Sequence, residues 1–184
     1  MKKIPTLFER DWEGDRSRVV NLVHSGCEWV IDGEGIATRK LDGTSCLIRN
    51  GQLYKRRELR KGDKEPSQFE IADYDEETGK TVGWVPVGEG PEDRWHREAF
   101  TTTVDGTYEL VGPKIQGNPE QATIHMLLSH DGADTFPDAP RTFDGLREWL
   151  ADKDIEGLVF HHPDGRMAKI KLRDFGLKRV RKEI

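Results

Sequence analysis

The sequence has few cysteines and no long apolar run, and both absences limit the classes of protein to which it can belong. Its two cysteines, Cys27 and Cys46, are too few for a disulfide framework. No apolar run approaches the roughly 18 residues that a membrane-spanning helix requires. The segment Met1–Pro5 lacks the apolar core of a signal peptide. We therefore expect a protein of a reducing, cytoplasmic compartment.

The sequence also lacks an excess of positive charge, since its formal net charge is -5 at pH 7. The charges are nevertheless unevenly distributed. Basic residues gather in 55–61 and again in 169–182, whereas acidic residues dominate 70–77 and 89–93. This asymmetry permits either a positive cleft on an acidic body or ordinary solvated faces. A length of 184 residues is enough for one domain with a real core.

The pattern of apolar residues and turns predicts an α+β fold that is rich in antiparallel strands and has few helices. An Asp-Gly or Asn-Gly pair between two apolar runs indicates a tight hairpin turn. Asp42-Gly43 and Asn50-Gly51 are such pairs, so we expect an antiparallel meander with Lys40 near one end. Further strands are expected at 29–31, 101–103, 107–111, 123–128, 155–161 and 167–172, the last two joined by the turn at 163–165.

Three other segments complete this description. Apolar residues recur at helical spacing in 142–152, which predicts a helix. Residues 18–23 fit either a short helix or a strand. Residues 61–100 are polar and irregular but contain large aromatic residues, so we expect an ordered insertion with one hairpin around 77–80, in which Trp84 and Trp95 serve for packing.

Five features follow one another in an order that suggests chemistry. Lys40 begins a Lys-x-Asp-Gly motif, and Arg56 and Arg57 lie on a later strand. The segments Tyr108–Gly112 and Glu156–Phe160 each place a glutamate in an apolar strand, where a carboxylate is costly unless it is paired. Lys169 and Lys171 share one strand face because side chains alternate.

In this order the features resemble the covalent nucleotidyltransferases, which are the polynucleotide ligases and mRNA capping enzymes. The segment Tyr108–Asn118 is most similar to the RNA ligases, whose third motif continues into a similar glycine-containing loop. The resemblance covers roughly residues 35–175. It implies a minimal nucleotidyltransferase domain, similar to ATP-grasp ligases, that spans 1–184 with an insertion at about 61–100 and without an OB-type domain at its C-terminal end.

The resemblance also implies a function and assigns residues to it. An ATP-dependent RNA ligase joins 3′-hydroxyl and 5′-phosphate ends through a lysyl-AMP intermediate, as in RNA repair. Its cofactors would be ATP and Mg²⁺ or Mn²⁺. Its partners would be RNA ends, nicked or single-stranded, and a protein that strengthens binding to the nucleic acid. Lys40 would be the nucleophile, and Lys169 and Lys171 would neutralise the transferring phosphate. Glu156 would hold the metal ion, and the nucleotide would contact Thr38, Arg39, Leu41, Ser45, Arg56, Arg57 and Glu109.

Two alternatives remain open at this stage. One is a DNA-nick ligase or a capping-type enzyme that uses GTP, and the other is a nucleic-acid-binding module without activity. The sequence also departs from the family at one place, because segment 125–130 has no aromatic residue to stack on adenine, so that an aliphatic or histidine contact must substitute. Of the two arginines, Arg56 is favoured over Arg57 for the site, since alternation lets one of them face it.

Overall fold

The computed structural model describes residues 2–76 and 78–179, and the described chain divides into two compact units. The central unit comprises residues 42–132 together with residues 2–3. The terminal unit comprises residues 4–41 and 133–179. The prediction of one domain over 1–184 stays a prediction. No helix within the described ranges is both long enough and apolar enough to cross a membrane.

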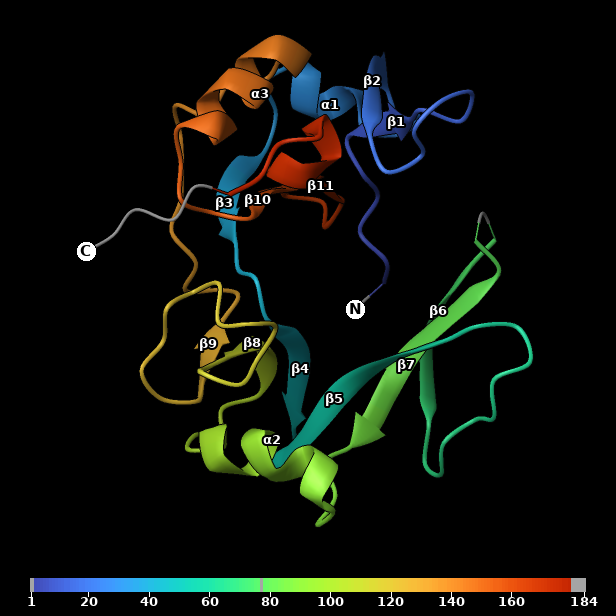
Figure 1. Cartoon of the computed structure of the whole chain (residues 1–184), viewed down its shortest axis with the longest axis vertical. Coiled ribbons are helices and arrows are strands. Elements are labelled where there is room, and N and C mark those ends of the chain that lie inside the picture. The colour runs from blue at the N-terminus through green and yellow to red at the C-terminus, as the bar shows by residue number, and fades with distance from the viewer. Residues whose placement is uncertain (1, 77, 180–184) are drawn as a thin grey trace. The chain divides into compact units, whose positions relative to one another are not determined.

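The terminal unit is built on a three-stranded antiparallel sheet with the order β11-β10-β3. Its strands are β3 (Ile36–Lys40), β10 (Gly157–His161) and β11 (Met167–Lys171). The helices α1 (Glu28–Ile31) and α3 (Phe143–Ala151) lie on the same side of this sheet (Figure 1). Two further strands, β1 (Phe8–Arg10) and β2 (Val19–Val23), pair with each other, and a 3-10 helix (Leu172–Phe175) follows β11.

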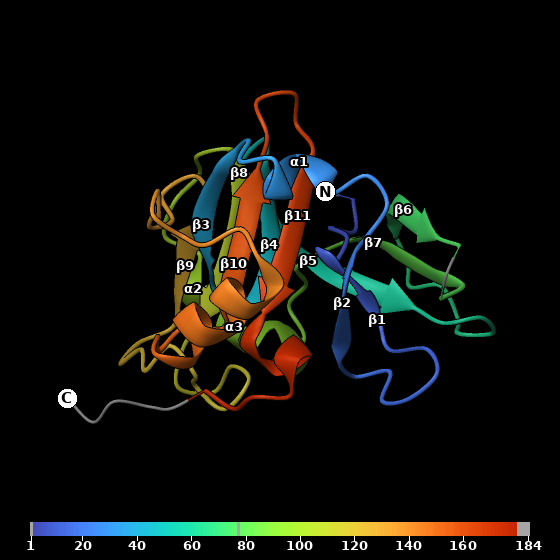
Figure 2. The ribbon, with the colours of Figure 1, turned by 90° about the horizontal axis from the view of Figure 1, so that it is seen from above.

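The core of the terminal unit lies between the sheet and these helices. Leu146 and Leu150 of α3 pack with Leu158, Phe160 and Ile170 of the sheet, and all five are fully buried. Figure 2 shows α3 and α1 in front of β10 and β11, covering that face. The opposite face of the sheet carries the side chains that alternate with this core, Lys40 among them.

The central unit contains a six-stranded sheet with the order β6-β7-β5-β4-β8-β9, in which every neighbouring pair is antiparallel. Cys46, Ile48 and Leu53 of one face form its core with Tyr108 and Leu110. The helix α2 supplies Ala99 to that core. The elements are β4 (Thr44–Arg49), β5 (Gln52–Leu59), β6 (Glu70–Asp75), β7 (Lys80–Pro86), a 3-10 helix (Pro91–Asp93), α2 (Arg94–Ala99), β8 (Gly106–Val111) and β9 (Met126–Ser129).

Several sequence predictions are confirmed. The described residues contain three α-helices and many antiparallel strands, in agreement with an α+β fold. Asn50 and Gly51 join β4 to β5, and both have positive φ angles, of 52° and 70°, as a tight hairpin requires. The helix at 142–152 is α3, and the Thr142 hydroxyl caps it by accepting a hydrogen bond from the Gly145 amide. The hairpin at 163–165 joins β10 to β11, and residues 18–23 hold the strand β2.

Three predictions are wrong. Asp42-Gly43 does not form a hairpin, because β3 pairs with β10 whereas β4 pairs with β5 and β8. Residues 29–31 belong to α1 and not to a strand: Trp29 and Val30 are adjacent and both buried in one core, which a helical turn permits and an alternating strand does not. Residues 101–103 are not in a strand, and β8 pairs instead with β4 and β9.

The segment 61–100 is more regular than its composition indicates. It contributes β6, β7 and α2, and β7 pairs with β5 inside the large sheet. The predicted hairpin joins β6 to β7, although Glu77 of its turn lies outside the described residues. Trp84 is buried in the sheet and Trp95 stacks on His125, so both serve for packing as predicted.

Candidate functional site

Strand register brings three lysines to one face of the terminal unit's sheet. Ala37 of β3 points into the core, so Lys40 points to the opposite face. Lys40 is opposite Gly157 of β10, and Gly157 is opposite Lys171 of β11. Lys169 lies two residues before Lys171 and therefore shares its face. Residues far apart in the sequence thus converge around Lys40.

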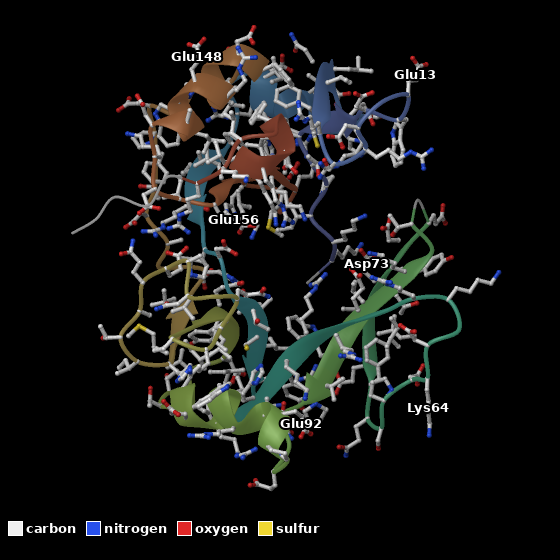
Figure 3. All side chains as sticks on the ribbon, in the orientation of Figure 1. Glu13, Lys64, Asp73, Glu92, Glu148 and Glu156 are labelled. Carbon is white, nitrogen blue, oxygen red and sulfur yellow. The ribbon has the colours of Figure 1, made fainter. Side chains whose placement is uncertain are left out.

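Glu156, the residue before β10, bridges two of these lysines. Its Oε2 atom accepts a hydrogen bond from Lys40 Nζ at 2.6 Å, and its Oε1 atom lies 2.5 Å from Lys171 Nζ. Only 10% of the Glu156 side chain is exposed, against 20% for Lys40 and 14% for Lys171. Figure 3 labels Glu156 on the side of the sheet that faces away from α3. One carboxylate therefore holds both ammonium groups in a sheltered cluster.

The contacts within this cluster shift the pKa values of Glu156 and Lys171. Burial alone would raise the pKa of Glu156, but the ammonium groups of Lys40 and Lys171 outweigh burial and hold this pKa below its ordinary value. Burial lowers the pKa of Lys171, and the charge of Lys40 lowers it further against the opposing effect of Glu156. Perturbed groups of this kind are common at sites that perform chemistry.

The lowered pKa of Glu156 leads to a prediction about stability in acid. A carboxyl group whose pKa is lower in the folded than in the unfolded protein adds stability above its unfolded value, here 4.5, and this contribution is lost as the pH falls through the folded pKa. We expect the loss of unfolding free energy below about pH 4.5 to be smaller in Glu156→Gln than in the wild-type protein. Urea unfolding at pH 7, 4.5 and 3 measures this difference. An identical acid response of the two proteins would contradict it.

Gly157 allows the lysines to approach each other. A Cβ atom at this position would lie 2.1 Å from the Ile170 carbonyl oxygen and 2.7 Å from the Lys171 Cα atom. Both of these are backbone atoms of the paired strand, so an added methyl group would force β10 away from β11. A smaller residue than alanine is therefore required between Lys40 and Lys171.

We expect Gly157→Ala to lower the free energy of unfolding by about 1–3 kcal/mol, as overpacking of a tight site does. Thermal unfolding of the variant measures this loss. Gly132→Ala is the matched control, because its Cβ atom would meet no heavy atom closer than 3.7 Å. Equal stability of the two variants would show that the strands adjust without strain.

The other residues predicted beside Lys40 are divided between the two faces of β3. The Thr38 hydroxyl lies on the face of Lys40, 3.0 Å from His161 Nε2 and 3.2 Å from the Val159 carbonyl oxygen. Alternation turns Arg39 to the other face, where its guanidinium lies 3.7 Å from Asp134. Leu41 is buried, and its carbonyl oxygen accepts a hydrogen bond from Lys40 Nζ at 3.3 Å.

In the central unit, Ser45 and Glu109 are directly opposite each other on β4 and β8. The carboxylate of Glu109 is 9% exposed and is held on both sides. Its Oε1 atom accepts a hydrogen bond from the Gly43 amide at 3.1 Å, and its Oε2 atom lies 3.0 Å from His130 Nε2. The other ring nitrogen of His130 lies 3.0 Å from the Thr107 hydroxyl. The Glu109 carboxylate is thereby fixed in one orientation.

Gly43 is needed for this arrangement. A Cβ atom on it would lie 2.2 Å from the Leu110 carbonyl oxygen and 3.0 Å from the Glu109 Cγ atom. Glycine at the third position after Lys40 thus serves a close approach of two chain segments and not a hairpin turn. The Ser45 hydroxyl is buried and has no hydrogen-bond partner among the described residues.

The two arginines of β5 lie on opposite faces of the six-stranded sheet. Arg56 shares the face of Ser45 and Glu109, and its guanidinium lies 5.9 Å from the ring centre of Trp84. Burial lowers the pKa of Arg56 despite nearby carboxylates. Arg57 is exposed on the other face. Arg56 and not Arg57 therefore lies on the face of Ser45 and Glu109, in agreement with the preference for Arg56 in the sequence analysis.

The structure therefore gathers the predicted residues into one group in each unit. Thr38, Lys40, Glu156, Lys169 and Lys171 form the lysine group of the terminal unit. Ser45, Arg56 and Glu109 form the second group, in the central unit. Arg39 and Arg57 belong to neither group, and Leu41 contacts the lysine group through its carbonyl oxygen.

Sequence reasoning gave no contact to His161, and it considered a histidine of segment 125–130 only as a substitute for the aromatic residue that stacks on adenine. His161 contacts Thr38, and His130 contacts Glu109. The strand that precedes His130 was recognised as the one without an aromatic residue, but the partner of the histidine was not. Alternation along β9 and β10 offers a signal, because each histidine falls in step with residues of the functional face.

Comparisons with known proteins support a relationship with RNA ligases. No family model matches the chain. Two known proteins are similar to it, and both are named RNA ligase 1. The protein from Mus musculus is 24% identical over an alignment of 220 positions, which covers 77% of this chain and 67% of the relative. The protein from Pongo abelii is 26% identical over 151 residues, which cover 62% of this chain and 46% of the relative. The chain thus spans from less than half to about two thirds of the length of these relatives.

Proposed function

We propose that this protein is an ATP-dependent RNA ligase that works through a covalent Lys40-AMP intermediate. The observation that carries the proposal is the lysine group, in which Glu156 holds Lys40 beside Lys171 across Gly157. A nucleophilic lysine needs a sheltered amine and nearby positive charge, and the transfer of a phosphoryl group needs cations around the phosphate. The similarity to two proteins named RNA ligase 1 supports RNA as the substrate.

The proposed reaction has three steps. The neutral amine of Lys40 attacks the α-phosphorus of ATP, a phosphorus–nitrogen bond forms, and pyrophosphate leaves. A 5′-phosphate of the RNA then attacks the same phosphorus, displaces Lys40 and takes up AMP. A 3′-hydroxyl finally attacks the RNA 5′-phosphorus, forms the phosphodiester bond and releases AMP. The amine proton lost in the first step passes to solvent, and a proton from solvent returns to the Lys40 nitrogen as it leaves in the second step. The proton of the 3′-hydroxyl passes to solvent in the third step.

The side chains of the lysine group divide this work. Lys40 Nζ is held at 2.6 Å from Glu156, which fixes the direction of the amine. Lys171 and Lys169 supply positive charge to the phosphate during transfer. Because the pKa of Glu156 is lowered, its carboxylate stays ionised at neutral pH and orients Lys40 without keeping the proton.

The central unit supplies groups suited to a ribose. Glu109 is a carboxylate acceptor whose orientation is fixed by Gly43 and His130. The buried Ser45 hydroxyl has no partner among the described residues, and a ligand that supplied one would remove an energetic penalty. Arg56 is a half-buried cation on the same face, suited to phosphate or ribose oxygens.

Mg²⁺ or Mn²⁺ would complete the proposed chemistry by neutralising phosphate charge when bound. Within the described ranges, no cluster of three or more His, Cys, Asp or Glu residues could hold a metal ion alone. Mg²⁺ is often held by one or two carboxylates together with substrate phosphates. Glu156 fits that pattern as a single carboxylate beside the proposed phosphate site.

The proposed partners are RNA ends, either nicked or single-stranded. Specific RNA binding requires contacts to 2′-hydroxyl groups or to splayed bases. We propose that surface groups of both units provide the grip on RNA, and that a partner protein can add to it.

Labelling of the protein tests the proposal directly. The protein is incubated with α-labelled ATP or α-labelled GTP and either Mg²⁺ or Mn²⁺, and is then denatured. Covalent label from ATP is the expected result, followed by the joining of RNA ends in preference to DNA ends. Label from GTP would indicate a capping-type reaction. No label from folded protein that is free of bound AMP would refute an enzymatic role and favour a nucleic-acid-binding module.

A further inference from the structure

The N-terminal segment of the chain lies along the outer edge of β11, the strand that carries two of the three lysines. The Lys169 amide donates a hydrogen bond to the Pro5 carbonyl oxygen at 2.9 Å, and the Lys169 carbonyl oxygen accepts one from the Leu7 amide at 2.8 Å. Thr6 thereby forms a parallel bridge with Lys169. Backbone amides two residues apart on a strand face the same edge, so the Lys171 amide also faces outward.

A buried carboxylate satisfies this second amide. Asp174 lies in the 3-10 helix that follows β11, and its Oδ2 atom accepts a hydrogen bond from the Lys171 amide at 2.9 Å. Its Oδ1 atom accepts one from Arg10 Nη1, also at 2.9 Å. A backbone amide and a guanidinium can only donate, so the direction of both bonds is fixed. Arg10, on β1, is held in turn by the Ser17 carbonyl oxygen at 3.1 Å and the Thr6 hydroxyl at 3.3 Å.

The backbone around Lys171 is thus held from both edges of β11. On the inner edge, Lys171 is opposite Gly157, and the amide of the next residue, Leu172, donates to the Glu156 carbonyl oxygen at 2.9 Å. Lys171 is the last residue of its strand and has a long side chain, so a small rotation of its backbone moves the ammonium group much further. A misplacement of about 1 Å at a reacting group can slow a reaction by about 10²-fold.

We propose that Asp174, held by Arg10, is a positioning residue that fixes Lys171 for the transfer of the phosphoryl group. The inference rests on the proposed function, because it concerns how Lys171 meets the transferring phosphate. A lysine that turns from Glu156 to a phosphate loses its side-chain partner, whereas the backbone bond to Asp174 remains. Arg10 lies outside the region 35–175 that resembles the nucleotidyltransferases, so this support comes from a part of the chain to which the resemblance assigns no role.

The variant Asp174→Asn tests the inference. The asparagine amide has a single acceptor oxygen and both partners of Asp174 are donors, so one of the two bonds is lost in either orientation of the amide. We expect single-turnover labelling at saturating ATP to slow by about five- to twentyfold, with a change in KM for ATP of less than about twofold. In a Lys171→Ala background the same substitution should change the rate by less than about twofold, because the residue through which it acts is gone.

A structural role alone would not depend on the Lys171 side chain. Slowing by the same factor in both backgrounds, or no slowing in the protein that retains Lys171, therefore overturns the inference. If Asp174→Asn does not fold, Arg10→Gln decides by the same comparison, because it leaves the bond between Asp174 and the Lys171 amide in place. A two- to fivefold slowing, about half the effect on a logarithmic scale, is expected for it when Lys171 is present.

Glu9→Gln is the matched control on β1. Glu9 precedes Arg10, but its carboxylate lies 2.9 Å from His24 Nδ1. Glu9→Gln should be labelled at the wild-type rate, and slowing equal to that of Arg10→Gln overturns the inference. The two proposals fail separately. Absence of label in the wild-type protein refutes the proposed function, and the inference falls with it, whereas a labelled wild type with equal factors in both backgrounds refutes only the role of Asp174.

Discussion

Replacement of Lys40 by alanine is expected to abolish covalent labelling of the protein by α-labelled ATP. The variant has no amine to attack the α-phosphorus, because Lys40 supplies the Nζ atom that contacts both the Glu156 carboxylate and the Leu41 carbonyl oxygen. Loss of a catalytic nucleophile lowers the rate by a factor on the order of 10³ or more. Gel detection of labelled protein after denaturation measures the effect.

Lys178→Ala is the matched control for this experiment, because Lys178 is an exposed lysine of the same unit. It should take up label at the wild-type rate. If Lys40→Ala were labelled as strongly as this control, the nucleophile would be another residue. Labelling of a Lys40→Arg variant would also contradict the assignment, because the guanidinium of arginine stays protonated and is a poor nucleophile.

Replacement of Lys171 by alanine is expected to slow labelling by about 10²–10³-fold while the variant stays folded. The variant leaves Lys40 and Glu156 in place but removes the second cation that we propose to act on the transferring phosphate. Lys171→Arg keeps the charge and should recover part of the lost rate. Single-turnover labelling at saturating ATP measures the chemical step separately from binding.

Two further measurements distinguish a role of Lys171 in phosphoryl transfer from a role in packing or in ATP binding. The backbone amide of Lys171 donates to Asp174 at 2.9 Å, and this contact does not depend on the side chain. A large loss of thermal stability in Lys171→Ala would therefore indicate a packing role for the lysine stem. A rate that falls only through a higher KM for ATP would indicate a role in binding rather than in transfer.

Local patterns predicted the parts of the fold that depend on near neighbours. The Asn50-Gly51 turn, the helix capped by Thr142 and the hairpin between β10 and β11 all involve residues close together in the sequence. Their signals are an Asn-Gly pair, apolar residues at helical spacing and a turn between two apolar runs, and each can be recognised from a few residues.

The pairing of β3 could not be predicted in the same way. Residues 36–40 have the alternation of a strand, but nothing in them distinguishes the next strand from β10 as a partner. The Asp42-Gly43 pair favoured the nearer partner and was misleading, because Gly43 is required there for the close approach of Leu110. Long-range pairing is decided by the burial of Ala37 with Leu158 and Phe160, which only the folded core reveals.

The sequence predicted which residue types make up the candidate site, but it did not predict the contacts between their side chains. The order of motifs identified Lys40, Glu109, Glu156 and Lys171, but the bridging of two lysines by Glu156 depends on the register of three strands. Alternation places both histidines in step with the candidate site residues, but their contacts could not be predicted from the sequence. Their roles depend on partners from other strands, Thr38 and Glu109.

The discontinuity of the terminal unit has a consequence for synthesis on the ribosome. Residues 42–132 form one continuous stretch of the central unit, so most of that unit can fold as soon as the stretch has emerged. The strand that carries Lys40 emerges earlier, but its partner β10 is made only after the whole of this stretch. The strand that carries Lys40 therefore has no β10 to pair with while the central unit forms. A nascent chain released before residue 157 would hold a folded central unit and an unfolded site for Lys40.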